Sequence, residues 1–324
     1  MELVEPALPR VNYQLSMKGW TKNMEKALIG MNFPDKTRAE NLEAALQQIV
    51  SNGYDCVEFC LSTYPLIVGG EIHWEYVNYV KDIFEKFPLK YTGHIGMGLE
   101  LRNIHELDLQ KSVLKASIDI CSVLKLNPLT LHFEQSSMYL QKEKAFLEGH
   151  IEAADYAASL GLTLCMENIE VEHHTRVLEM IDKVNRNNFK MTLDTGHLNL
   201  STTHFGYDFK MAVKECAPYV GHIHLNDNTA SFEEMRLTNF PLYKILPMGY
   251  RIAFGRGDIH LPPFWGKIPM KWVLETLNDI GFSGVYLCEY ENELYVPFQK
   301  GIQQNVRKIV TDIRAQKSNC EGVK

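Results

Sequence analysis

Alternation between helical and strand-like segments is the feature that most constrains the fold of this chain. From residue 38 onward, windows with apolar residues three or four positions apart alternate with short runs of β-branched and aliphatic residues. Such alternation is typical of successive βα units around a parallel sheet. Eight runs are predicted to be strands: Arg10–Ser16, Cys56–Leu61, Lys90–Ile95, Leu129–Phe133, Thr163–Glu167, Lys190–Asp194, Gly221–Leu225 and Val285–Glu289. With a last helix near Phe298–Arg314, the pattern predicts an α/β fold, a single (β/α)8 TIM barrel.

Three of these units share a helix that ends in glycine and a strand that ends in glutamate. The glycines are Gly53, Gly161 and Gly281. Glycine supplies the left-handed cap that ends a helix before the chain turns back into a barrel. The repetition favours one continuous domain over residues 1–324 rather than two domains.

Three segments are expected to lie outside the regular barrel. Residues 1–9 form an N-terminal extension, residues 229–267 form a long loop after the seventh strand, and residues 316–324 form a flexible polar tail. A loop of this length is usually functional, and this one is rich in aromatic residues. We expect it to cover a pocket or contact another subunit, and a packed surface excursion is the alternative.

Composition excludes several classes of protein. With 45% hydrophobic residues the chain can bury a large core, and it has no run of 18 apolar residues that would span a membrane. The start of the sequence lacks the features of a signal peptide, so we expect a cytoplasmic location. The seven cysteines show no paired spacing and are expected to be free thiols. The net charge of −7 argues against nucleic acid as the main partner. The expected protein partner is a further copy of the same chain, in a homo-oligomer.

Four apolar runs end in a side chain that can bind a metal ion. These side chains are Glu167, Asp194, His224 and Glu289. Because the carboxyl ends of barrel strands lie on one face, we expect the four to converge. Three carboxylates and an imidazole suit one divalent metal, with Mn²⁺ as the first choice and Mg²⁺, Co²⁺ or Zn²⁺ as alternatives. A single Glu or His at a strand end is as often structural, so the prediction depends on the combination.

Further polar side chains are expected around the same cavity, namely His94, His132, His197, Asp258 and His260. His222 is two residues before His224, which places it one layer deeper, in a structural role. Glu58 ends the second predicted strand and is either a substrate contact or the partner of an internal charge. The histidines on predicted helices are expected to be solvated: His73, His105, His150, His173, His174 and His204.

Five short motifs together resemble a known superfamily. They are MEN (166–168), LDTGH (193–197), HLND (224–227), GDIHLPP (257–263) and CE (288–289). In this order they resemble the xylose isomerase-like barrels, which include sugar isomerases, sugar epimerases and endonuclease IV, over residues 38 to 315. The resemblance implies that Glu167, Asp194, His224 and Glu289 bind one divalent metal. It also makes His94, His197, Asp258 and His260 substrate-binding candidates and relates them, with His132, to the residues that hold a trinuclear zinc cluster in endonuclease IV.

The resemblance implies a metal-dependent enzyme that abstracts a proton next to the metal-bound carbonyl of a keto-sugar or sugar derivative. Glu167 and Glu289 are the expected acid and base, and His132 is a further candidate base. The outcome is isomerisation, epimerisation or a lyase-type elimination, as in the larger subunit of C-glycoside deglycosidases, which acts on 3-oxo-glycosides with a small second subunit. The alternative is an endonuclease IV-like abasic-site phosphodiesterase with three zinc ions. The acidic balance and the apolar long loop favour the sugar enzymes.

Overall fold

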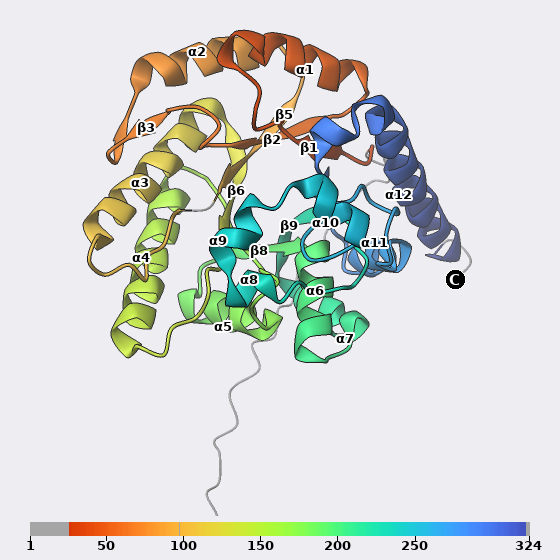
Figure 1. Ribbon diagram of the computed structural model, residues 1–324. Coiled ribbons are helices and arrows are strands. Elements are labelled where there is room, and N and C mark those ends of the chain that lie inside the picture. Colours follow the sequence, from red (N-terminus) through yellow and green to blue (C-terminus); the bar gives the residue numbers. More distant parts are fainter. Residues whose placement is uncertain (1–25, 97, 322–324) are drawn as a thin grey trace, which may run out of the picture.

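Eight parallel strands close into a barrel in the computed structural model, which describes residues 26–96 and 98–321, with side chains up to residue 317 (Figure 1). The order around the barrel is β1-β10-β9-β8-β7-β6-β5-β2. The strands are β1 (Ile29–Asn32), β2 (Cys56–Cys60), β5 (Lys90–Ile95), β6 (Leu126–His132), β7 (Leu164–Glu167), β8 (Phe189–Asp194), β9 (Val220–Leu225) and β10 (Tyr286–Cys288). The predicted TIM barrel is confirmed.

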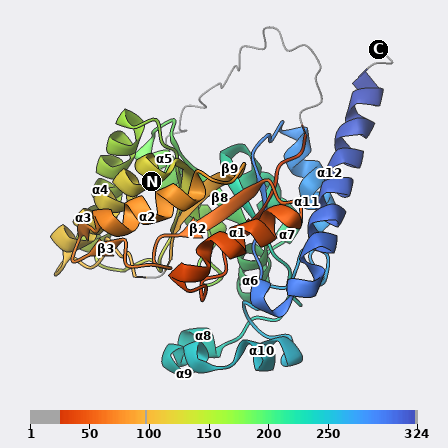
Figure 2. The ribbon, with the colours of Figure 1, turned by 90° about the horizontal axis from the view of Figure 1, so that it is seen from above.

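Helices connect successive strands and cover the outside of the barrel (Figures 1 and 2). They are α1 (Leu42–Ser51), α2 (Trp74–Phe84), α3 (Leu107–Leu124), α4 (Leu140–Ser159), α5 (His174–Val184), α6 (Thr195–Phe205), α7 (Phe209–Cys216), α11 (Met270–Asp279) and α12 (Gln299–Glu321). A small hairpin, β3 (Ile67–Val68) and β4 (Glu71–Ile72), precedes α2. Short 3-10 turns occur at Ala39–Asn41, Ala217–Tyr219, Asn292–Leu294 and Val296–Phe298. No helix within the described residues is long and apolar enough to cross a bilayer.

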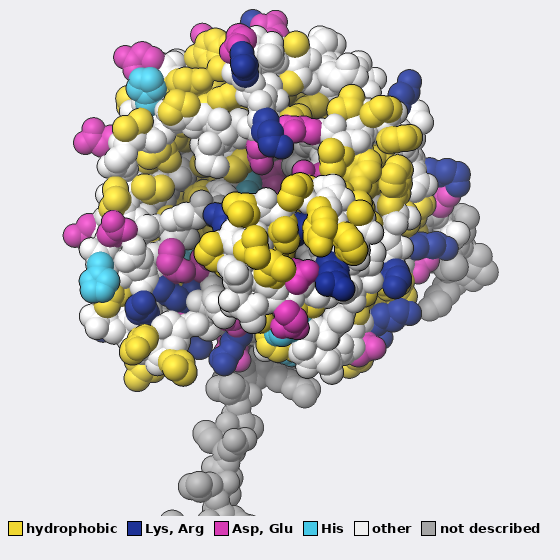
Figure 3. Space-filling view, in the orientation of Figure 1, with side chains coloured by type: hydrophobic (Ala, Val, Ile, Leu, Met, Phe, Trp, Pro, Cys, Tyr) yellow, Lys and Arg dark blue, Asp and Glu magenta, His cyan; other side chains and the backbone are white. Residues whose placement is uncertain are grey.

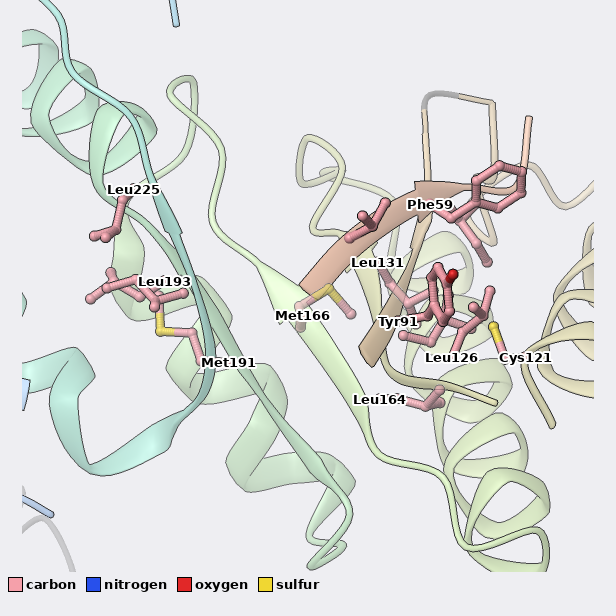
Figure 4. Close-up of a cluster of buried hydrophobic side chains, with 14 of the residues drawn as sticks. Phe59, Tyr91, Cys121, Leu126, Leu131, Leu164, Met166, Met191, Leu193 and Leu225 are labelled. Carbon is pink, nitrogen blue, oxygen red and sulfur yellow. The ribbon is translucent and has the colours of Figure 1, made fainter. Parts of the chain in front are cut away.

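The strands separate an outer apolar shell from an interior that holds a small apolar cluster, Cys56, Val285 and Leu287, as well as polar side chains. Alternate strand residues pack against the helices, and Figure 4 shows this cluster at Phe59, Leu131, Met166, Leu193 and Leu225. Residues of the opposite parity face the barrel axis, because successive side chains of a strand point to opposite faces. Two of them, Thr130 and Thr192, meet through their Oγ1 atoms at 3.0 Å. The inward set is therefore polar toward the carboxyl ends of the strands, where an active site of this fold lies.

The predicted glycine caps are present in the structure. Gly53, Gly161 and Gly281 follow α1, α4 and α11 and adopt positive φ angles of 86°, 71° and 80°. L-residues with a side chain rarely adopt this conformation, which explains why glycine ends each of these helices.

The first strand of the barrel lies later in the chain than predicted. The barrel is closed by Ile29–Asn32, which pairs with both β10 and β2. The predicted strand Arg10–Ser16 and the predicted extension at residues 1–9 lie outside the described residues. At the other end, α12 continues to Glu321, well into the segment predicted to be a flexible tail.

The long loop after β9 contains three short helices, α8 (Met235–Thr238), α9 (Phe240–Ile245) and α10 (Met248–Phe254). They stand away from the helices that surround the barrel (Figure 2) and expose apolar side chains next to a hollow (Figure 3). Tyr250 and Phe254 are more than half exposed. Arg236 joins the loop to the barrel, since its Nε lies 2.5 Å from Oε1 of the buried Glu170. The expected homo-oligomer and second subunit stay predictions.

Candidate metal centre

Four strand ends bring three carboxylates to one imidazole nitrogen. Nδ1 of His224 lies 3.0 Å from Oε1 of Glu167, 3.1 Å from Oε2 of Glu289 and 3.9 Å from Oδ2 of Asp194. Glu167 and Asp194 end β7 and β8, His224 is the last residue but one of β9, and Glu289 directly follows β10. The parallel order of the barrel therefore places all four on one face. Potential ligand atoms of all four lie within 4.8 Å of one another. The predicted metal-ligand set is thus one cluster in space.

The electrostatics of this cluster fit a cation. Burial and the neighbouring carboxylates of Glu289 and Glu167 raise the pKa of Asp194 to about 7. Burial also acts to raise the pKa of Glu289, but His224 and His260 outweigh it and hold that pKa at about 2. Oε2 of Glu289 is buried and accepts no formed hydrogen bond among the described residues, although Nδ1 of His224 lies 3.1 Å away. A divalent ion bound by these oxygens would replace protons and satisfy the buried charge.

Asp194 is fixed by its neighbours before any ligand binds. Its Oδ1 accepts a hydrogen bond from the backbone N–H of His197 at 2.6 Å, which makes Asp194 the N-cap of α6. Its Oδ2 accepts one from Nδ2 of Asn226 at 2.5 Å. Asn168 exchanges two hydrogen bonds with the backbone of Asp194. Asn168 and Asn226 were given no role from the sequence, although each follows a predicted ligand within two residues.

Two histidines flank Glu167 on its other oxygen. Nε2 of His94 and Nε2 of His132 each lie 3.2 Å from Oε2 of Glu167. Burial acts to lower the pKa of His94, but the Cys60 thiol and the Glu167 carboxylate outweigh it and raise that pKa. Burial likewise acts to raise the pKa of Glu167, but His224 and His132 keep it well below its usual range. Glu167 therefore faces proton donors on one side and the predicted ligands on the other.

A third group joins the cluster from the long loop. Oδ2 of Asp258 lies 2.9 Å from Nε2 of His260 and 3.3 Å from Nε2 of His197. Nδ1 of His260 is 3.7 Å from Oε2 of Glu289, which connects this group to the four predicted ligands. Burial acts to lower the pKa of His260, yet Asp258 and Glu289 raise it to about 10. Every site residue predicted from the sequence is thus part of one continuous cluster.

Other histidines divide between the barrel interior and the helices. His222 is 1% exposed and contacts Glu58, which agrees with the structural role predicted for it. Two helix histidines expected to be solvated are buried instead. His150 lies against Phe146, and burial lowers its pKa to about 4. Nε2 of His174 lies 2.6 Å from Oε2 of Glu215.

The six cysteines with described side chains are free thiols.

Comparisons with known proteins give one family. The profile of the family described as "Xylose isomerase-like TIM barrel" matches residues 46–312. A curated D-psicose 3-epimerase from Agrobacterium fabrum (strain C58) is 32% identical over 88 residues, which are 25% of this chain and only 29% of the epimerase.

Solved structures share the fold along almost the whole chain. Crystal structures of D-psicose 3-epimerase from Clostridium cellulolyticum H10 with D-tagatose match with a TM-score of 0.64 and 14% identity, covering 89% of this chain and 99% of the epimerase. A xylose isomerase-like TIM barrel protein from Mycobacterium smegmatis in complex with magnesium has a TM-score of 0.64 and 12% identity, covering 90% of this chain and 98% of that protein. Identities this low show similarity of fold.

Proposed function

The chain belongs to the xylose isomerase-like TIM-barrel family, and on that premise we propose that it is a divalent-metal-dependent enzyme that moves a proton next to the carbonyl of a keto-sugar or sugar derivative. The observation that carries this proposal is the set of three carboxylates around Nδ1 of His224. This set offers oxygen-rich coordination for one cation. Mn²⁺ is the first choice of metal.

Each group near the predicted ligands has a proposed task. Bound to Glu167, Asp194, His224 and Glu289, a divalent cation would add the positive charge that acidifies a proton next to a carbonyl. Glu167 and Glu289 accept and return the proton at carbon. His132 is within hydrogen-bonding distance of Oε2 of Glu167, so it can exchange a proton with this carboxylate.

The four remaining site residues are proposed to bind the substrate. They are His94, His197, Asp258 and His260. Asp258 lies between the rings of His197 and His260, so the three form a polar patch beside Glu289. Hydroxyl groups are the natural ligands of such a patch, because imidazole donates to them and carboxylate accepts from them. The structure of a related epimerase with D-tagatose supports a keto-sugar as the first substrate to examine.

The proposal is tested by proton exchange. The Mn²⁺-loaded protein is incubated in deuterium oxide with D-tagatose or D-psicose, and the sugar is followed by mass spectrometry and NMR. We expect deuterium at the carbon next to the carbonyl, accompanied by the isomer or epimer. A 3-oxo-glycoside examined in parallel would instead lose its aglycone if the same proton abstraction leads to elimination. Absence of both exchange and elimination from keto-sugars and 3-oxo-glycosides would contradict the proposed function.

Replacement of His132 by alanine separates binding from proton transfer. If Glu167 and Glu289 alone move the proton and His132 only donates a hydrogen bond to a substrate oxygen, His132→Ala should raise KM and leave kcat within about tenfold of the wild-type value. The measurement is steady-state kinetics at constant metal content. A fall in kcat of about 10² or more with the metal retained would assign the base to His132 instead.

A three-zinc phosphodiesterase is the second candidate, and a specific observation favours it. Beside the four predicted ligands, three more groups of the described residues have metal-binding geometry. Two of them, His94 and His132 with Glu167 and His197 and His260 with Asp258, lie beside the predicted ligands, and the third is Glu58 with His222 and His224. The four-ligand set and the two groups beside it would together suit three ions. Against this candidate stands the charge of −7, since DNA binding requires clustered Lys and Arg. Cleavage of an abasic-site duplex by the zinc-loaded protein would establish it.

A further inference from the structure

A buried glutamate lies below the predicted ligands, on the inner face of β2. Glu58 has a side chain that is 2% exposed. Its Oε2 accepts hydrogen bonds from Oγ1 of Thr92 and Nε2 of His222, both at 3.1 Å. Its Oε1 lies 2.9 Å from the buried Nε2 of His224, at ion-pair distance but without the geometry of a formed hydrogen bond. The carboxylate therefore contacts three side chains, from β5 and β9, and one of them is a predicted metal ligand.

The two nitrogens of His224 face different partners. Nδ1 faces the carboxylates of Glu167 and Glu289, whereas Nε2 faces Glu58 on the opposite side of the ring. An imidazole that binds a metal through one nitrogen carries its proton on the other, and a carboxylate is the strongest common acceptor for that proton. Thr92 and His222 hold Oε2 of Glu58, so the orientation of the carboxylate toward His224 does not depend on His224 alone.

We propose that Glu58 is a positioning residue of the metal centre, which fixes the ring of His224 and keeps the ring proton on Nε2, so that the lone pair of Nδ1 points toward the metal. This inference rests on the proposed metal site. Glu58 has no proposed contact with the substrate, because its oxygens contact Thr92, His222 and His224 inside the barrel. Its effect on the reaction passes through His224.

The contacts of Glu58 distinguish this role from that of an ordinary buried ion pair. A buried carboxylate without partners is costly, and Thr92 and His222 already satisfy one oxygen. The second oxygen makes its closest described ion-pair contact with His224. Glu58 therefore connects Nε2 of the predicted ligand His224 to the hydrogen bonds of Thr92 and His222. Packing of the barrel alone does not require this connection.

The test is the metal affinity of Glu58→Gln, which keeps the size of the side chain and removes its charge. Titration calorimetry with Mn²⁺ is expected to show binding about 10- to 100-fold weaker than that of the wild type, as is usual when the partner of a ligand histidine is lost. Glu170→Gln is the matched control, since Glu170 is also a buried glutamate and its ion-pair partner is Arg236 rather than a predicted ligand. The control should bind Mn²⁺ within about threefold of the wild type. Equal affinity of Glu58→Gln and wild type would overturn the proposal, whereas a wild type that binds no metal would overturn the proposed function itself.

A second measurement uses the wild-type chain, so that it does not depend on the folding of a variant. Long-range ¹⁵N NMR spectra of the Zn²⁺-loaded protein report which nitrogen of His224 carries the proton. We expect a protonated Nε2, protected from exchange, and a metal-bound Nδ1. A proton on Nδ1 with metal at Nε2 would overturn the assignment, because Glu58 would then face the wrong nitrogen.

Discussion

Replacement of Glu167 by glutamine is expected to lower kcat by about 10³-fold or more and to weaken Mn²⁺ binding sharply. Glu167 takes part in both proposed tasks, since Oε1 lies 3.0 Å from Nδ1 of His224 and Oε2 lies 3.2 Å from Nε2 of both His94 and His132. The amide has almost the same shape but cannot accept a proton, and it is a poorer ligand for a hard cation. The side chain of Glu167 is 1% exposed, so a water molecule cannot take the place of the lost carboxylate.

The measurement for Glu167→Gln combines deuterium exchange with titration of the metal. Glu148→Gln is the matched control, because Glu148 is the same residue type, 57% exposed on α4, where it pairs with Lys144. Surface ion pairs of this kind contribute little, so the control should behave as the wild type does. A Glu167→Gln variant that retains turnover within about tenfold would remove Glu167 from the mechanism.

Replacement of Gly196 by alanine is expected to weaken metal binding, because it displaces Asn226, which holds the predicted ligand Asp194. A Cβ atom at Gly196 would lie 1.7 Å from Oδ1 and 2.8 Å from Cγ of Asn226. Asn226 must then move, and its hydrogen bond to Oδ2 of Asp194 is lost. We expect a loss of stability of about 1–3 kcal/mol from overpacking and metal binding that is at least about tenfold weaker.

Gly301→Ala provides the comparison for Gly196→Ala. Gly301 lies in α12, and a Cβ there would meet nothing within 4 Å. Alanine at such a position should be neutral or stabilise by up to about 1 kcal/mol, because it favours the helix. Chemical denaturation and metal titration of both variants check the prediction. If Gly196→Ala retained wild-type stability and affinity, the contact between Asn226 and Asp194 would not be needed.

The site was predictable because the inward ends of parallel strands meet on one face of a barrel. Glu167, Asp194, His224 and Glu289 each end an apolar run, and this local feature can be read without knowing the contacts. The same reasoning found the glycine caps, whose positive φ angles depend only on the local turn. Local patterns were therefore sufficient to predict both the barrel and the side chains at the carboxyl ends of its strands.

Features that depend on distant contacts were missed. The first strand, Ile29–Asn32, is four residues long and includes a glycine, and it is a strand because β10 and β2 pair with it on both sides. An alternating segment at Arg10–Ser16 had the stronger local signal. An internal partner was one of the two alternatives for Glu58, but its identity as His222 was not predictable, because the contact spans 164 positions of sequence. Burial of His150 likewise depends on which face of α4 meets the strands.

The central claim is that one divalent cation binds where the four strands end, and metal content per chain tests it most directly. The protein is purified without added metal, dialysed, and measured by inductively coupled plasma mass spectrometry beside Asp194→Asn. We expect about one equivalent of Mn, Co or Mg in the wild type and a large loss in Asp194→Asn, which removes one of the three carboxylates. Three zinc ions per chain, or equal metal content in the wild type and Asp194→Asn, would contradict the account.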